Sequence, residues 1–128
     1  MQNKWQEVAP RDGVKLIHEY GLRDFPLLNC KYYHWMNCAV VAVLEYSDEC
    51  EVHIAMHEDC RSQCREFVSD LKALIKKPIL ALMDKHNKPV INLAKRCGFE
   101  FIEEFRSLDV NLNQREVVKY GFRKCIGS

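Results

Sequence analysis

The sequence predicts one α+β domain over residues 1–128, with a mixed β-sheet of about six or seven strands flanked by about three or four helices. Two observations support this fold class. An apolar run, a helical pattern and a second strand pattern follow one another over 78–106. Upstream, residues 38–44 are apolar throughout and residues 50–57 alternate between two faces. These two patterns are typical of a central strand and of a half-buried strand.

Composition and charge exclude several classes of protein. Hydrophobic residues make up 48% of the chain and charged residues 29%, as in ordinary globular proteins. The formal net charge of +1 gives no basic footprint for nucleic acid. No apolar run approaches the ~20 residues of a spanning helix, and the N-terminus lacks the apolar core of a signal peptide. We therefore expect a cytoplasmic protein with neither a membrane nor a nucleic-acid partner.

Seven cysteines are present, an odd number with no spacing typical of a disulfide framework. Several of them lie inside apolar runs. We expect reduced thiols, most of them acting as small core residues.

The first elements are short. Trp5–Val8 is a plausible strand, and Asp12 can cap a helix that runs to Tyr20 and stops at Gly21. Residues 22–29 have no clear periodicity and predict a loop or a short irregular helix.

A hairpin and a third strand follow. Residues 32–46 are too long for one strand, so we expect a hairpin that turns near Asn37. Its second strand should be covered on both faces, and 47–49 should be the turn that leaves it. In the next strand one face carries Cys50, Val52, Ile54 and Met56, and the other carries Glu51, His53, Ala55 and His57.

The second half contains two predicted helices. The first, over 61–76, has an apolar stripe made of Cys64, Phe67, Val68, Leu71, Leu74 and Ile75. Asn87 can cap the second, Pro89 fits its first turn, and Gly98 can end it in the left-handed conformation. Its apolar face is made of Val90, Leu93, Ala94 and Cys97. A polar loop over 108–115 and a last strand over 117–124 complete the chain.

The stretch from Asn87 to Gly98-Phe99 resembles motif B of the GNAT N-acetyltransferase superfamily, which ends in Gly-Phe. The order of predicted elements is similar to the GNAT order over roughly the whole chain. The resemblance implies a GNAT-like sheet whose central strands, here 50–57 and 78–83, splay to admit acetyl-CoA. It also implies acyl transfer to an amine on a small molecule or a protein.

In GNAT enzymes a glycine-rich turn after the fourth strand exposes backbone amides to the cofactor pyrophosphate. Here that turn is 61–66: Arg61 matches the family pattern, and side chains replace the glycines, so the loop is degenerate and binding should be weakened. Lys85 and Lys88 could also meet phosphates, or could be ordinary solvated charges. The resemblance implies cofactor contacts by Met56, Arg61, Ser62, Gln63, Cys64, Arg65, Glu66 and Asn87.

Two side chains are candidates for the general base, Glu51 and His53, which share one strand face. Histidine titrates near neutral pH and suits this task. The alternative is that both merely line a half-solvated sheet face. Many family members carry a tyrosine seven residues after the motif B asparagine as general acid, whereas this chain has Ala94.

A metal site is the weaker of two interpretations for His57, Cys60 and Cys64. These three could converge on zinc if the turn between them is tight, but ordinary core or surface cysteines are the favoured explanation. We expect no metal.

Two functions remain open at this point. The first is an acetyl-CoA-dependent N-acetyltransferase. The second is a catalytically inactive head-assembly or internal virion protein involved in DNA ejection. This chain is small and its glycine loop is eroded, and in both respects it is similar to GNAT-like proteins of tailed bacteriophages. That alternative implies virion or assembly proteins as partners, and a location in the host cytoplasm or virion interior.

Overall fold

The computed structural model describes residues 4–23, 25–108 and 112–122. Within these ranges the chain forms the predicted α+β architecture. The elements are β1 (Trp5–Val8), α1 (Pro10–Glu19), β2 (Lys31–Trp35), β3 (Ala39–Glu45), β4 (Cys50–Met56), the 3-10 helix η1 (Glu58–Gln63), α2 (Cys64–Leu74), β5 (Ile79–Asp84), α3 (Lys88–Arg96), β6 (Glu100–Leu108) and β7 (Gln114–Phe122). None of the helices in these ranges is long and apolar enough to cross a membrane.

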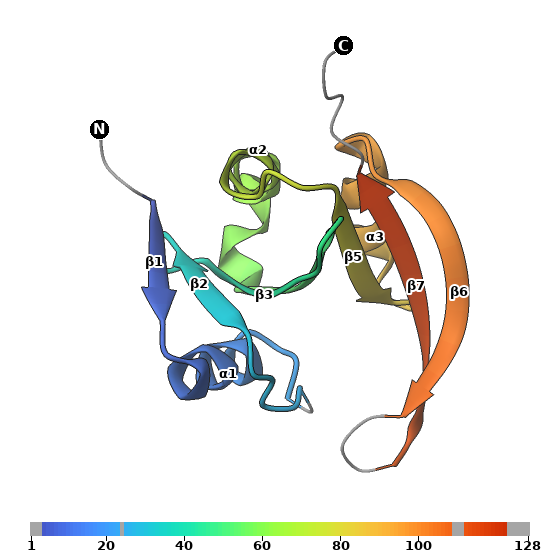
Figure 1. The fold of residues 1–128 in the computed structure, drawn as a ribbon, viewed down its shortest axis with the longest axis horizontal. Coiled ribbons are helices and arrows are strands. Elements are labelled where there is room, and N and C mark those ends of the chain that lie inside the picture. The colour runs from blue at the N-terminus through green and yellow to red at the C-terminus, as the bar shows by residue number, and fades with distance from the viewer. Residues whose placement is uncertain (1–3, 24, 109–111, 123–128) are drawn as a thin grey trace.

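The seven strands form one mixed sheet in the order β1-β2-β3-β4-β5-β7-β6. All neighbours run antiparallel except β4 and β5, which are parallel. The sheet twists so strongly that β1–β3 and β5–β7 form two walls at a steep angle (Figure 1). The mixed sheet predicted from the sequence is confirmed.

The sheet is split between β4 and β5. The parallel ladder joins only Cys50–Val52 to Ile79–Ala81, three residue pairs, although both strands continue beyond it. Along its whole length β4 stays paired with β3, and β5 stays paired with β7. The two strands therefore separate toward their C-terminal ends, as the GNAT resemblance implies for 50–57 and 78–83.

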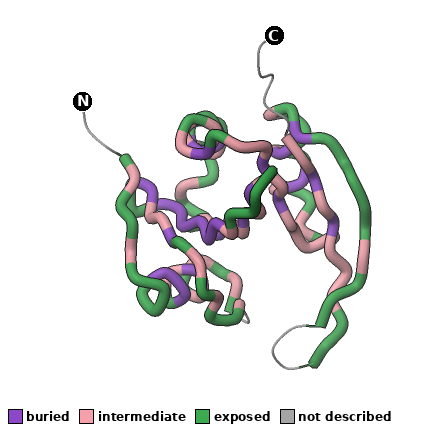
Figure 2. Tube along the Cα trace, viewed as in Figure 1, coloured by how far each residue is buried: buried purple, intermediate pink, exposed green. Residues whose placement is uncertain are grey.

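The helices cover the two faces of the sheet separately. α1 packs on one face through a cluster that includes Ile17, Tyr32 and Val40. α2 and α3 pack on the opposite face through a larger cluster around Phe67 and Ile91. Figure 1 shows α1 and α2 on opposite sides of β3. β3 is buried over most of its length, as predicted, whereas β6 is an exposed edge strand (Figure 2).

The β2–β3 hairpin turns through Met36 and Asn37, which confirms the predicted turn near Asn37. Both residues have positive φ, 48° and 54°, and the Cys38 amide donates to the Trp35 carbonyl at 2.8 Å. Two consecutive left-handed residues match the right-handed twist of the flanking strands.

Helix α1 begins differently from the prediction. Its N-cap is Ala9 and Pro10 occupies the first turn, so Asp12 lies inside the helix instead of capping it. Proline at this position loses no intrahelical hydrogen bond. The predicted stop is confirmed, because Gly21 follows the helix with φ +120°.

Helix α3 begins after Asn87 as predicted, but the Asn87 side chain makes no capping hydrogen bond. Gly98 ends the helix with φ +93°, the conformation that glycine adopts at lowest cost. Ile91 and Ala94 are its buried residues, so the apolar face is rotated toward Ile91 relative to the predicted one.

The predicted helix over 61–76 is two elements. η1 precedes α2, and α2 ends at Leu74. Phe67, Val68 and Leu71 of the predicted stripe are its buried residues. Residues 109–111 of the predicted polar loop, residues 123–124 of the predicted last strand and Cys125 lie outside the described residues.

Two cysteines depart from the expected reduced state. Cys38, beside the hairpin turn, and Cys60, in η1, are joined by a disulfide with their Cα atoms 5.7 Å apart. The hairpin and η1 meet in space because β3 and β4 are paired, and sequence spacing does not reveal this contact. Free thiols among the described residues are those of Cys30, Cys50, Cys64 and Cys97.

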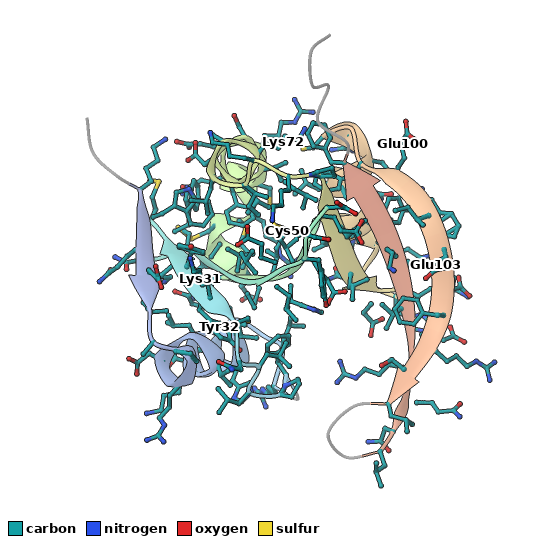
Figure 3. All side chains as sticks on the ribbon, viewed as in Figure 1. Lys31, Tyr32, Cys50, Lys72, Glu100 and Glu103 are labelled. Carbon is teal, nitrogen blue, oxygen red and sulfur yellow. A yellow bond between two sulfur atoms is a disulfide. The ribbon has the colours of Figure 1, made fainter. Side chains whose placement is uncertain are left out.

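Glycine at position 13 permits a close approach between α1 and the sheet. A Cβ atom there would lie 2.4 Å from the ring of Tyr32, which is fully buried between β2 and α1 (Figure 3). This contact seats α1, and with it the start of the 22–29 loop, against the sheet.

Candidate functional site

A groove of about 570 Å³ lies on the α1 face of the sheet, beside the split; we call it the His53 groove. Glu51 and His53 of β4 line it together with Asp84 at the end of β5. Its apolar wall comes from the 22–29 loop and from β5, β6 and β7, and includes Leu22, Phe25, Leu28, Leu82, Phe105 and Val117. The groove has the size of a small-molecule site.

Glu51 and His53 form a hydrogen-bonded pair in this groove. His53 Nε2 lies 3.0 Å from Glu51 Oε2, and the two side chains are 20% and 21% exposed. The ring of Phe25 packs edge-on against the imidazole of His53, with the two ring centroids 5.3 Å apart. When Nε2–H donates to the carboxylate, Nδ1 is the nitrogen left with a lone pair. The pair is therefore built like a carboxylate–imidazole base.

The 22–29 loop is held over β4 by specific hydrogen bonds. The Tyr32 hydroxyl donates to the Leu28 carbonyl at 3.1 Å and accepts from the Leu28 amide at 3.0 Å. His18 Nε2 lies 2.7 Å from the Phe25 carbonyl oxygen. Burial raises the pKa of Tyr32 to about 12, so its hydroxyl stays protonated at physiological pH. These contacts place Phe25 against His53.

A second groove, of about 350 Å³, lies at the C-terminal end of β4; we call it the Met56 groove. It is lined by the end of β4, by residues at the start of α2 and α3, and by the end of α1. Two arginines line it, Arg61 from η1 and Arg96 from the last turn of α3, together with Asn87. Two guanidinium groups suit a ligand that carries phosphate.

The two grooves are neighbours along β4. Leu22 lines both of them, and on β4 the lining of the first groove ends at His53 and that of the second begins at Ile54. The boundary between them lies where β4 and β5 have already separated. Ligands in the two grooves would therefore lie on neighbouring stretches of β4.

The residues expected to contact a cofactor are only partly brought together. Met56, Arg61, Cys64 and Asn87 line the Met56 groove, whereas Ser62, Gln63, Arg65 and Glu66 do not. The Glu66 carboxylate instead accepts a hydrogen bond from Lys4 Nζ at 2.7 Å. Its negative charge is thus offset by a partner from near the N-terminus.

The segment that precedes α2 has few open amides. The His57 ring accepts from the Asp59 amide at 3.1 Å, and the His57 carbonyl accepts from the Cys60 amide at 2.9 Å. Farther along, the Cys64 amide donates to the Arg61 carbonyl. A phosphate at this turn would therefore depend more on side chains than one held by a glycine-rich turn.

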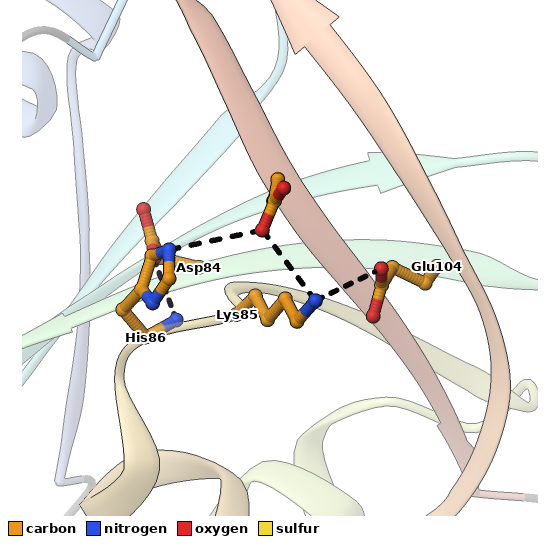
Figure 4. A network of polar contacts seen from close by, with 5 residues as sticks. Asp84, Lys85, His86 and Glu104 are labelled. Carbon is orange, nitrogen blue, oxygen red and sulfur yellow. Dashed lines mark hydrogen bonds and ion pairs between the residues drawn. The ribbon is translucent and has the colours of Figure 1, made fainter.

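Lys85, one of the lysines considered for phosphate contact, is engaged elsewhere. Its Nζ lies 3.2 Å from Glu104 and 3.5 Å from Glu116, in a network that also includes His86 (Figure 4). These ion pairs raise the Lys85 pKa, with the hydrogen bond to Glu104 as the largest cause. The network ties the end of β5 to β6 and β7.

The zinc interpretation of His57, Cys60 and Cys64 does not fit the structure, because the Cys60 sulfur is bonded to Cys38. No group of three or more histidine, cysteine or acidic side chains gathers around a metal position in the part of the chain that the structure describes. Cys64 instead donates to the sulfur of Met56 at 3.3 Å, and burial raises the pKa of its thiol.

Sequence reasoning missed many of the lining residues, among them Tyr20, Phe25 and Arg96. Tyr20 lines the Met56 groove, with its hydroxyl 2.8 Å from His34 Nε2 and 3.2 Å from the Asn37 carbonyl, to which it donates. Tyr20 and Phe25 reach the site only because α1 packs on the sheet, which no local pattern reveals. Arg96 had a usable signal, since it lies in the last turn of the predicted helix, two residues before its stop at Gly98.

Comparison with solved structures identifies the fold. A probable acetyltransferase from Staphylococcus epidermidis ATCC 12228 superposes with a TM-score of 0.70 at 10% identity, covering 96% of this chain and 99% of that chain. The acetyltransferase (GNAT family) from Bacillus anthracis gives a TM-score of 0.61 at 8% identity and covers 96% of both chains. The structure of yncA, a putative acetyltransferase from Salmonella typhimurium with its cofactor acetyl-CoA, gives a TM-score of 0.61 at 9% identity and covers 98% of both chains. At such identities the likeness establishes the fold.

No protein-family model matches the sequence, and no curated protein matches it.

Proposed function

We propose that this chain, which has the GNAT acetyltransferase fold, is an acetyl-CoA-dependent N-acetyltransferase that transfers an acetyl group to a primary amine. The observation that carries the proposal is the split between β4 and β5, with one groove beside it and a second at the C-terminal end of β4. One groove offers arginines for phosphates, and the other offers a basic pair for an amine. Nucleophilic acyl transfer requires both ligands to meet at one point.

The Met56 groove is the proposed acetyl-CoA site. Arg61 and Arg96 would bind phosphate oxygens, and Asn87 and Met56 would contact the rest of the ligand. When bound, acetyl-CoA supplies an activated thioester carbonyl. The residues that line the groove fit such a ligand in charge, although the degenerate 61–66 turn predicts weaker binding than a glycine-rich one would give.

Glu51 and His53 are the proposed catalytic residues. An amine in the His53 groove must lose a proton as it is acylated, and His53 Nδ1 is the acceptor we assign to it. Glu51 would hold the imidazole in the required tautomer and balance the positive charge that His53 gains. Ile54, the next residue of β4, lies on the cofactor side of the strand.

The test is amine-dependent formation of an acetylated product, measured by mass spectrometry with acetyl-CoA and a mixture of primary amines. We expect product with the wild-type chain and a loss of product with His53→Gln. An absence of product from any amine would contradict the enzyme and favour the inactive assembly protein considered from the sequence. The virion partners of that alternative and the cytoplasmic location remain predictions.

A further inference from the structure

The His53 groove has an apolar wall that the fold leaves open to solvent. Phe25, Leu28, Leu82, Phe105 and Val117 all line it and are only half-buried. A ligand that removes apolar side chains of this kind from water is bound more tightly, because burying apolar surface lowers the free energy of the complex. They come from a loop and from three strands, so the groove offers apolar contacts from several sides.

Four ionisable side chains line the groove, and two of them, Glu51 and His53, are the proposed catalytic pair. Two carboxylates, Glu51 and Asp84, line it against one guanidinium, that of Arg115. The Asp84 carboxylate also accepts from the His86 amide at 2.8 Å, which fixes its position at the end of β5. The groove therefore attracts a single ammonium group near His53, and it offers mainly apolar contacts to the rest of a ligand.

We infer that the acceptor is a small primary amine carried on an aliphatic or aromatic body, and not a polyamine or a polar amino alcohol. This inference rests on the proposed function, because it names the substrate class of the same site. A second ammonium group, as in spermidine, would be desolvated against the apolar wall without a partner. A branched alkyl or phenyl group would pack against Phe105 and Phe25 instead.

The reaction balances without any further reagent. The amine nitrogen forms a bond to the thioester carbonyl carbon, and the carbon–sulfur bond breaks. The bound ammonium first releases one proton to solvent, which frees the lone pair that attacks. The second proton passes to His53 Nδ1 and then to the departing thiolate, so the products are the amide, the free thiol of coenzyme A and one released proton.

The experiment compares matched primary amines at fixed acetyl-CoA, with product quantified by mass spectrometry. 3-Methylbutylamine and phenethylamine are the apolar members, and ethylamine, ethanolamine and spermidine are the controls. We expect kcat/KM for the apolar amines to exceed that for ethylamine by at least about tenfold, from the extra apolar surface that they bury.

A pair of variants on one strand ties the preference to the groove. Phe105→Ala should reduce kcat/KM for phenethylamine severalfold and leave that for ethylamine nearly unchanged. Phe101→Ala removes an exposed aromatic ring that pairs with Tyr120 on the other face of β6, and it should change neither value. Ligand-observed NMR of phenethylamine without acetyl-CoA gives a second readout, which Phe105→Ala should weaken.

The outcomes separate the two proposals. Faster acetylation of spermidine or ethanolamine than of phenethylamine would overturn the substrate class and leave the N-acetyltransferase standing. Bound acetyl-CoA with no acetylation of any amine would overturn the proposed function, and the substrate class with it. Equal loss of phenethylamine turnover in both phenylalanine variants would also contradict the assignment of the groove.

Discussion

Glu51 and His53 illustrate how much function depends on the neighbours of a residue. The alternation of β4 places both side chains on one face of the strand, and their contact follows from that geometry. Phe25 then covers the imidazole from a loop that is remote in sequence. A half-solvated sheet face becomes a groove with a basic group in it only because this loop closes over the strand.

His53→Gln should reduce kcat of the proposed reaction by about 10²-fold or more, the usual contribution of a positioned general base. The affinity for acetyl-CoA, measured by calorimetry, should stay within about twofold, because His53 does not line the Met56 groove. His86→Gln, at an exposed position outside both grooves, is the control. An unchanged kcat in His53→Gln would remove this residue from the mechanism.

Gly13→Ala should destabilise the fold. The added methyl group would meet the buried Tyr32 ring, and overpacking of this kind typically costs about 1–3 kcal/mol. Chemical denaturation would measure the change in unfolding free energy. Gly21 has φ +120° and open space around it, so Gly21→Ala would lose stability for a different reason. There the added methyl group would strain the backbone and would meet no neighbouring atom. Full stability of Gly13→Ala would contradict the α1–β2 packing described here.

His34 should make stability depend on pH. Burial lowers the pKa of His34 below its usual value, and the Glu19 charge opposes this effect only in part. The unfolded chain therefore takes up this proton at a higher pH than the folded chain does. The contribution of neutral His34 to the unfolding free energy is complete above about pH 6.5, the ordinary histidine pKa. It is lost as the pH falls through the lower pKa of the folded state.

We therefore expect the unfolding free energy to decline between about pH 7 and pH 5, and to decline less in His34→Gln. Denaturant titrations at several pH values would show this difference in slope. His86→Gln is the matched control, since its side chain is 78% exposed. Parallel slopes for wild type and His34→Gln would contradict the sign of the His34 shift.

At the scale of elements, local signals predict some parts of the chain and miss others. Pro89 and Gly98 mark the ends of α3, and the alternation of β4 assigns Glu51 and His53 to one face; both outcomes are seen in the structure. Two features depend on pairs of elements distant in sequence, namely the Cys38–Cys60 disulfide and the placement of Phe25 over β4. No periodicity within one element encodes them, because they follow from the packing of α1 and the pairing of β3 with β4.

The disulfide predicts a measurable contribution from the hairpin–η1 connection. It closes a loop with a sequence separation of 22, for which chain entropy predicts about 3 kcal/mol of stabilisation. Cys60→Ser, or reduction of the wild type, should lower the unfolding free energy by up to this amount. Non-reducing peptide mapping would identify the bond.

Cys30→Ser is the matched control for that comparison, because Cys30 is a free and partly buried thiol. Equal stability of the oxidised and reduced wild-type chain would show that the bond does not form in solution. The chain would then carry the reduced cysteines that the sequence predicts.

At the scale of the whole molecule, the fold and its split sheet were predictable because every element agrees with the GNAT order. The binding properties of the candidate site were harder to predict from the sequence. The 61–66 turn looks eroded in sequence, yet two arginines from different helical elements line the groove and Glu66 is paired with Lys4. Loss of a glycine-rich motif therefore changes how phosphate would be held, without removing positive charge from the site.

Calorimetry of acetyl-CoA binding tests the central claim most directly. The account predicts a Kd in the micromolar range for the wild type and a loss of at least about tenfold in Arg61→Glu, because a charge-assisted contact to phosphate becomes a repulsion. Arg65→Glu, four residues farther along and outside the Met56 groove, should bind almost as the wild type does. Failure of the wild type to bind at millimolar acetyl-CoA, or equal loss in both variants, would contradict the account.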